Sequence, residues 1–408
     1  MPKKTFGRTP KVHARSASPA VANARQSTSP VNIPLFVIVA ALVAVGLVTV
    51  YSVTLTNAEY NFWRQVIGIG IGIVLMVLFW LFDYRRFGSW FVPLLVIDCL
   101  LIMLPMIPGL GIEVNGATSW IKIGPLTAQP SEWAKPVTIL MMAAGCARFD
   151  GEISKGTDYL KLVGCLLLPC VLLIREDLGS TLVLLVIGFF ILFVGGASRR
   201  WIIVTLLTLV VVVAGGLGLN SALNTWSGGD IQILKPYQMS RLLVFIDQDN
   251  PDYADDAYNL NQAKIAVGSG EITGKGFGNA TQSSGGFLPE AATDFIFCVY
   301  AEQFGFLGAL VLLALYLALM AVALTIGLRA SDKLGSCIVA GVMGMWLFQI
   351  LENIGMDLGL MPITGIPLPF MSYGSSFMLT NFICIGLLCS IWSRRLDVSN
   401  RTRKVASR

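Results

Sequence analysis

Long apolar runs separated by polar segments dominate this 408-residue chain. Because about 20 helical residues cross the hydrocarbon core of a bilayer, the pattern predicts a polytopic all-α membrane protein with ten spans. Ten spans place both termini on the same side of the membrane. We expect them near residues 32–53, 65–82, 88–107, 133–147, 160–174, 180–197, 201–219, 303–328, 334–356 and 376–393.

Basic residues are distributed unevenly across these predicted spans. With the N-terminus inside, 21 of the 29 Lys and Arg residues fall in the inner loops and tails. Positive residues gather on the cytoplasmic side of membrane proteins, so this asymmetry supports ten spans with both termini cytoplasmic. Residues 1–30 and 394–408 form basic tails on either side of a membrane domain over 31–393, and the N-terminal tail should be disordered.

Composition agrees with this class and excludes several kinds of chemistry. Hydrophobic residues make up 55% of the chain, charged residues 13%, and the mean hydropathy is +0.72. The single histidine, His13, lies in the N-terminal tail, which excludes a His-based metal site and a Ser-His-Asp triad in the membrane domain. Eight cysteines in or beside apolar runs, without a CxxC, are typical of packing residues. The small net charge of +5 reflects the basic residues of the inner loops and tails and does not indicate nucleic-acid binding.

Three predicted outer segments, 109–136, 220–302 and 357–376, are too long and too polar to serve only as connectors. Their Trp, Phe, Ile and Pro residues are unlike those of a disordered segment, so we expect these segments to fold against the helix ends. In the third segment, prolines at 362, 367 and 369 prevent a regular helix. Irregular backbone near a membrane lines a cavity or is covered by protein, which makes this segment, with Ser372, a candidate wall of a binding site.

One carboxylate lies at the boundary between an outer segment and an apolar run. Asp294 follows Glu290 and Thr293 and immediately precedes Phe295. Partial desolvation there raises a carboxyl pKa toward the range of a general base. The alternative is an acid that caps a helix N-terminus, and position alone does not separate the two.

Other charged residues near the spans leave similar alternatives open. Asp98, Glu302 and Glu352 are intramembrane acids that can be functional, or can be paired or protonated for structural reasons. Lys135 and Arg64, at span starts, can bind phosphate or extend toward lipid headgroups. The glycine-rich run around Lys275 lacks the P-loop pattern, which excludes nucleotide binding but not a turn close to a membrane-bound ligand.

Four motifs in order along the chain, NGATSWIKIG, QPSEWAK, LPEAATDFIF with AEQFGFLG, and NIGMDLGLMPITGIPLPFMSYGSS, resemble the SEDS family of RodA and FtsW peptidoglycan glycosyltransferases. The resemblance implies a ten-helix enzyme that polymerises lipid II on the outer face of the bacterial cytoplasmic membrane. It also implies Asp294 as the catalytic residue. The implied substrate-binding residues are Arg64, Gln129, Ser131, Glu132 and Lys135. Lys275, Glu290, Thr293 and Ser372, in the outer segments, are further candidates for substrate binding.

The resemblance further implies a mechanism and partners. Asp294 takes the proton of the acceptor's 4-hydroxyl, while Arg64 and Lys135, with a divalent cation such as Mg²⁺ or Mn²⁺ as a candidate cofactor, stabilise the undecaprenyl pyrophosphate leaving group. Lipid II, the undecaprenyl-pyrophosphate-linked glycan, membrane lipids and a class B penicillin-binding transpeptidase are the implied partners. The chain departs from the family at Ser119, at residues 175–179 and in the single glycine of SYGSS.

Two other functional hypotheses compete with that of an enzyme. The intramembrane acids and the proline-broken segment would also suit a flippase for a lipid-linked precursor, although the sequence has no inverted repeat. A scaffold without catalysis would tolerate replacement of Asp294. Within the family, the motif sequences NIGM, TGIPLPF and GFLPE favour the elongation branch (RodA) over the division branch (FtsW).

Overall fold

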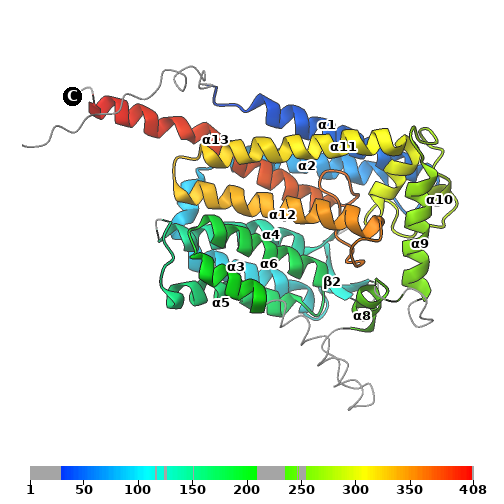
Figure 1. Cartoon of the computed structure of the whole chain (residues 1–408), viewed down its shortest axis with the longest axis horizontal. Coiled ribbons are helices and arrows are strands. Elements are labelled where there is room, and N and C mark those ends of the chain that lie inside the picture. The colour runs from blue at the N-terminus through cyan, green and yellow to red at the C-terminus, as the bar shows by residue number, and fades with distance from the viewer. Residues whose placement is uncertain are drawn as a thin grey trace, which may run out of the picture.

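The computed structural model describes residues 29–114, 117–123, 126–149, 151–208, 235–245, 247 and 254–406, and it is a bundle of helices that run roughly parallel to one long axis (Figure 1). A second, shorter set of elements covers one end of the bundle. The long helices are α1 (Ile33–Thr54), α2 (Phe62–Leu81), α3 (Phe91–Met103), α4 (Pro130–Ala147), α5 (Gly156–Leu173), α6 (Leu178–Val194), α11 (Ile296–Leu328), α12 (Lys333–Asp357) and α13 (Ser375–Ala406).

These helices lie where the hydrophobic pattern predicts spans. Six of the described helices are long and apolar enough to cross a membrane, and α3 and α6 are shorter apolar helices. For the predicted span at 201–219, residues 199–208 are helical and the remainder lies outside the described residues. The structure therefore confirms a polytopic helical protein, whereas the count of ten spans stays a prediction.

Two predicted spans have wrong boundaries. The span predicted at 303–328 begins seven residues earlier, at Ile296, and its helix is interrupted at Gly305, which has a φ of +64°. This left-handed conformation favours glycine and marks the place where the preceding segment is attached. Lys275 N donates to Glu302 O at 3.0 Å, and Gly276 N donates to Gln303 O at 3.0 Å. The span predicted at 88–107 shortens to α3 between two 3₁₀ turns, η2 (Tyr84–Ser89) and η3 (Leu104–Met106).

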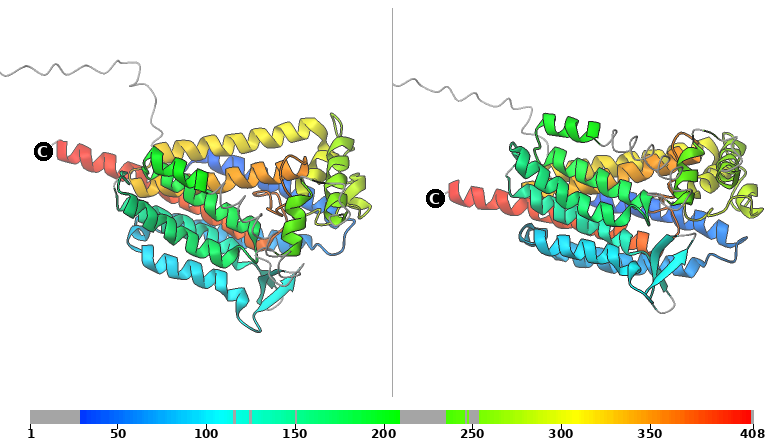
Figure 2. Two further views of the ribbon diagram at one scale, coloured as in Figure 1. Left: turned by 60° about the horizontal axis from the view of Figure 1, so that its bottom comes forward. Right: turned by 90° about the horizontal axis from the view of Figure 1, so that it is seen from below.

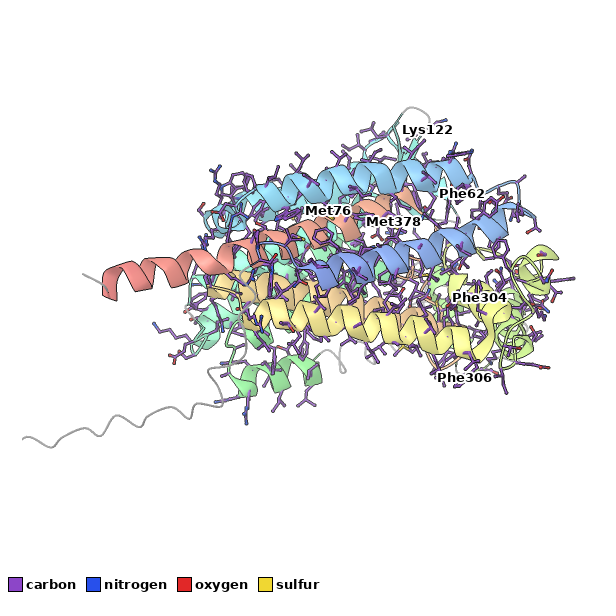
Figure 3. The ribbon with its side chains drawn as sticks, turned by 90° about the horizontal axis from the view of Figure 1, so that it is seen from above. Phe62, Met76, Lys122, Phe304, Phe306 and Met378 are labelled. Atoms are coloured by element: carbon purple, nitrogen blue, oxygen red, sulfur yellow. The ribbon has the colours of Figure 1, made fainter. Side chains whose placement is uncertain are left out.

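The helices form an inner and an outer layer. In the most apolar stretch of each helix, 72% of the residues of α12 and 83% of those of α13 are buried. In α2 the buried share is 22%. Accordingly α12 and α13 belong to the core, and α2 exposes apolar side chains as a lipid-facing helix does. Met76 of α2 and Met378 of α13 are both buried where these helices pack (Figure 3), while Phe306 of α11 is 59% exposed.

One end of the bundle, which we call the loop end, carries the remaining elements (Figure 2). A three-stranded antiparallel sheet in the order β1-β2-β3 forms there between residues 111 and 128, a feature that the hydrophobic pattern does not predict. The predicted 220–302 segment contributes three helices there, and its residues 220–234, 246 and 248–253 lie outside the described residues. The elements are β1 (Gly111–Val114), β2 (Ala117–Ile123), β3 (Leu126–Ala128), α8 (Pro236–Leu243), α9 (Ala254–Ser269) and α10 (Thr281–Ser284).

Candidate active site

A polar cleft of about 420 Å³ opens at the loop end of the bundle. It lies among the N-terminal ends of α2, α4, α6 and α13, strands β2 and β3, helix α8, and the irregular segments 290–294 and 363–374. The three segments predicted to fold against the helix ends all contribute to it. Its charged lining residues are Glu59, Arg64, Glu132, Glu176, Asp177, Arg241, Glu290 and Asp294, and Tyr60, Gln129, Tyr237, Gln238, Thr293, Thr364 and Tyr373 add polar side chains.

The backbone of Asp294 and of the two residues before it is held by hydrogen bonds from other segments of the chain. The carbonyls of residues 292–294 accept hydrogen bonds from Tyr373 N at 2.8 Å, Ser372 Oγ at 2.6 Å and Asn353 Nδ2 at 2.6 Å, in that order. Asn353 also donates to Ile366 O at 2.9 Å. Three consecutive carbonyls are thus held by α12 and the proline-rich segment, which fixes the position of the carboxylate.

The surroundings of the Asp294 carboxylate favour its protonated form. Burial, followed by the negative charge of Glu290, raises its pKa to about 7, while Arg241 acts in the opposite direction. Glu290 itself accepts a hydrogen bond from Thr293 Oγ1 at 2.9 Å. A carboxyl group that titrates near neutral pH in a cleft is suited to general base catalysis.

Gly365 leaves the space in which Asp294 and Arg241 face each other. A Cβ atom at this position would lie 2.9 Å from Asp294 Oδ2 and 3.2 Å from Arg241 Nη1, and the φ of Gly365 is +70°. Both the left-handed backbone and the two close contacts therefore require glycine.

We expect Gly365→Ala to impair this site. The added methyl group displaces Asp294 or Arg241, and because a 1 Å misplacement can lower turnover by about 100-fold, we expect a loss of turnover up to that size. The strained φ should also cost about 1–2 kcal/mol of stability. The catalytic rate and the thermal unfolding of the purified variant measure the two effects. Gly268→Ala, on α9 with open space around it, is the matched control and should keep wild-type turnover.

The opposite wall of the cleft is a hydrogen-bonded group around Asp177. Its Oδ2 accepts from Gln129 Nε2 and from Ser131 Oγ, both at 3.0 Å. Asp177 also caps α6, because its Oδ1 accepts from Ser180 N at 2.8 Å. Gln129 lines the cleft, whereas Ser131 is 3% exposed and lies behind Asp177. The predicted motif residues thus form a rigid wall in which some side chains face the cleft and others support them.

Lys135 is not at the surface of the cleft. Its side chain is buried, and Nζ donates to Glu132 Oε1 at 2.5 Å, one helical turn earlier on α4. Glu132 lines the cleft, and its backbone carbonyl accepts from Thr380 Oγ1 of α13 at 2.8 Å. This geometry makes Lys135 the counter-ion of Glu132.

Two other predicted residues also lie away from the cleft. Lys275 donates to Glu302 Oε1 at 2.6 Å and to Thr281 Oγ1 at 2.7 Å, which attaches the glycine-rich turn to α11. Ser372 is fully buried, and its contacts are those that hold residue 293 and Leu368 N. The structure therefore brings Arg64, Gln129, Glu132, Glu290, Thr293 and Asp294 together in one cleft, and gives Ser131, Lys135, Lys275 and Ser372 supporting contacts.

Sequence reasoning missed Arg241 and Tyr60. Arg241 of α8 lines the cleft opposite Asp294, 3.9 Å from Asp256 and with its guanidinium 5.9 Å from the Tyr237 ring. The i, i+4 spacing of Tyr237 and Arg241 is the signal that places both on one helical face. Tyr60 OH donates to Glu290 Oε2 at 3.4 Å, and burial raises its pKa.

The described residues do not form a ready metal site. Among them, no three His, Cys, Asp or Glu side chains come together in a way that could hold a metal ion. The cleft nevertheless contains more carboxylates than cations, and one or two carboxylates together with substrate phosphates are the ligands that Mg²⁺ usually takes. No chemical step below is assigned to one.

The fold and the cleft define this chain as a multi-pass membrane protein with a polar active-site cleft at one end of its helical bundle. The model of the FtsW, RodA and SpoVE family, described as cell cycle proteins, matches residues 33–396. The chain belongs to this family.

Curated relatives match over almost their whole length. Stage V sporulation protein E of Bacillus subtilis (strain 168) is 32% identical over 381 residues, which covers 90% of this chain and 98% of that protein. The probable peptidoglycan glycosyltransferase FtsW of Nitrosomonas europaea is 34% identical, covering 87% and 91%. The peptidoglycan glycosyltransferase MrdB of Escherichia coli (strain K12) is 33% identical, covering 82% and 86%. These similar identities do not separate the branches of the family.

Solved structures share the fold. A chain from a structure described as structural coordination of polymerization and crosslinking by a peptidoglycan synthase complex has a TM-score of 0.71 and 30% identity, covering 89% of this chain and 98% of that one. The rod shape determining protein RodA of Thermus thermophilus has a TM-score of 0.64 and 28% identity, covering 89% and 97%.

Proposed function

We propose that this protein is a peptidoglycan glycosyltransferase that polymerises lipid II into glycan strands. The observation that carries the proposal is the Asp294 carboxylate, held by its backbone in a polar cleft and with a pKa of about 7. The family and the names of relatives such as FtsW and MrdB support the same activity. The alternative of a flippase has no comparable support in the cleft.

In the proposed reaction Asp294 removes the proton from the 4-hydroxyl of the acceptor sugar. The hydroxyl oxygen attacks the anomeric carbon of the donor, and the bond from that carbon to the pyrophosphate oxygen breaks. The pyrophosphate keeps the electron pair and leaves with its undecaprenyl chain. A base placed in this way contributes about 10²-fold to 10⁴-fold to a rate.

The two arginine side chains that line the cleft can bind the pyrophosphate leaving group. Arg64, at the N-terminal end of α2, and Arg241, on α8, both line the cleft. Guanidinium groups bind phosphate oxygens with two parallel hydrogen bonds. We assign these two residues to the pyrophosphate, and Arg241 replaces Lys135 in the pair suggested by the sequence, because Lys135 is buried against Glu132.

Turnover should depend on the ionisation of Asp294. The carboxylate is the active form and its pKa is about 7, so kcat should rise with pH and level off above that value. In Glu290→Gln the midpoint should fall, because the negative charge that raises the pKa of Asp294 is removed. Initial rates of lipid II polymerisation between about pH 5.5 and 9 measure both midpoints. An unchanged midpoint in Glu290→Gln would contradict the assignment of the titrating group.

The orientation and partners follow from the same proposal. The loop end faces outward at the bacterial cytoplasmic membrane, and both termini are cytoplasmic, as the distribution of basic residues supports. A class B penicillin-binding transpeptidase is the proposed partner, in line with the related synthase complex. We assign the protein to cell elongation because of the sequences of its motifs. Restoration of rod shape after loss of an elongation polymerase, without rescue of a division polymerase, would test this role.

Reconstitution with lipid II tests the function directly. Purified protein in liposomes, with and without a cognate transpeptidase, should convert lipid II into glycan chains that a muramidase degrades. Transfer of lipid II between leaflets without polymer would indicate a flippase. Neither activity, with or without the transpeptidase, would indicate a scaffold and would contradict the proposal.

A further inference from the structure

Helix α8 carries Arg241 at the cleft, and the place of this helix depends on its contacts with the rest of the chain. It has eight residues, Pro236–Leu243, and a helix this short is not stable in isolation. On one side it is held by α9, because Asp256 Oδ2 accepts from Ser240 Oγ at 2.5 Å and Asp256 Oδ1 lies 3.9 Å from Arg241 Nε. Its position relative to the helical bundle is set by the contacts on its other side.

Those contacts converge on the turn between α5 and α6, where Glu176 is the charged partner. Glu176 Oε2 accepts from Nζ of Lys235, the N-cap residue of α8, at 2.7 Å, and the two side chains are 16% and 22% exposed. The Glu176 carbonyl accepts from Tyr237 OH at 3.3 Å, and Gln238 Nε2 donates to the carbonyls of residues 174 and 175, each at 3.3 Å. The ion pair is the shortest of these four contacts and joins two charged groups, which makes it the strongest of them.

Glu176 is itself fixed in place and also binds strand β2. Its amide N donates to Leu173 O at 2.9 Å, and the next residue, Asp177, caps α6. Glu176 Oε2 also accepts from Thr118 N at 2.9 Å, and the Glu176 carbonyl accepts from Ser119 Oγ at 3.0 Å. Glu176 thus joins α8 and β2, two elements that line the cleft, to the wall that contains Asp177.

The Glu176 side chain is a carboxylate at neutral pH. Burial raises its pKa, but the hydrogen bonds from Lys235 and from Thr118 N outweigh this effect, so the pKa lies below its usual value. A hydrogen bond to an ionised acceptor is roughly twice as strong as one between neutral groups. A glutamine at this position would keep the shape of the side chain and lose the charge.

We propose that Glu176 is a positioning residue, which through Lys235 holds α8 where Arg241 reaches the pyrophosphate leaving group. The inference rests on the proposed function, which assigns Arg241 to that group. Arg241 Nη1 and Asp294 Oδ2 border the same space beside Gly365, so the guanidinium lies close to the proposed base. A shift of α8 by about 1 Å is enough to lower turnover by up to about 100-fold.

The first test compares Glu176→Gln, Lys235→Met and Lys235→Arg in the lipid II polymerisation assay. We expect kcat to fall about tenfold in Glu176→Gln and in Lys235→Met. Lys235→Arg keeps a charged donor for Glu176 and should keep about half of the wild-type kcat or more. Asp158→Asn is the matched control, because it removes the acid of an ion pair with Lys161 on α5, 3.6 Å long and away from the cleft, and it should keep the wild-type kcat. Thermal unfolding verifies the fold of each variant.

The second test repeats Glu176→Gln in an Arg241→Gln background. If Glu176 acts by placing Arg241, its replacement should lower kcat by less than about twofold once Arg241 is absent, because the two changes remove the same interaction. A merely structural role, or direct binding of substrate by Glu176, would give the same loss in both backgrounds and would overturn the inference.

Three other results would also overturn the inference. They are a wild-type kcat in Glu176→Gln, a wild-type kcat in Arg241→Gln, and a Lys235→Arg variant as slow as Lys235→Met. In each case the wild-type protein still makes polymer, so the polymerase assignment stands. A wild-type protein that makes no polymer would instead refute the proposed function, and the inference with it.

Discussion

Replacement of Asp294 by Asn should lower lipid II polymerisation by about 10²-fold to 10⁴-fold, the usual contribution of a general base. The amide keeps the size of the side chain and cannot accept the proton of the acceptor hydroxyl. The hydrogen bonds that hold the backbone of residues 292–294 do not involve the Asp294 carboxylate, so the site should stay assembled. Polymer formation by the purified variant, followed with labelled lipid II, gives the measurement.

The stability of this variant provides a second readout. The pKa of Asp294 is raised from 3.8 to about 7, so ionisation costs native stability as pH rises through this window, and the full cost is present above pH 7. The substituted amide carries no charge, so Asp294→Asn should be at least as stable as wild type at about pH 8. Asp255→Asn, an exposed acid on α9, serves as the control and should polymerise lipid II normally. Substantial polymerisation by Asp294→Asn would rule out this base.

Replacement of Lys135 by Met should destabilise the protein by about 3–5 kcal/mol, as expected when one partner of a buried ion pair is removed. Both side chains of the Lys135–Glu132 pair are at most 4% exposed, and the atoms that join them are 2.5 Å apart. Met fills a similar volume, so the loss reports the uncompensated Glu132 carboxylate rather than a cavity. Unfolding in detergent, monitored by intrinsic tryptophan fluorescence, measures the change.

The double variant Glu132→Gln with Lys135→Met separates structure from substrate binding. If Lys135 acts only as a counter-ion, the double variant should regain most of the stability, because no buried charge is left unpaired. Lys161→Met, an exposed lysine on α5, is the control and should change stability by less than about 0.5 kcal/mol. A Lys135→Met protein with wild-type stability and no activity would instead place Lys135 at the pyrophosphate.

The sequence alone predicts the helical class, the positions of most spans and the three segments that form the cleft. Hydrophobic runs identify helices because the bilayer requires about 20 apolar residues in a row. The same rule misplaces the start of α11. Residues 296–302 combine apolar side chains with Glu302, whose charge is compensated by Lys275 and whose carboxylate also accepts a hydrogen bond from Thr281 N. The sheet between residues 111 and 128 is not detected by this rule, because its strands are short and lie outside the apolar runs.

The sequence by itself determined which residue types were available for chemistry, and it located Asp294 beside an apolar run. Only the tertiary structure decided which side chains meet. Arg64 and Arg241, 177 residues apart in the chain, line one cleft. Lys135 instead forms an ion pair with Glu132, and Lys275 forms one with Glu302. The physical reason is that a charged side chain near a membrane must find a partner or a hydrated cavity, and which of the two it finds depends on helix packing that local sequence patterns do not encode.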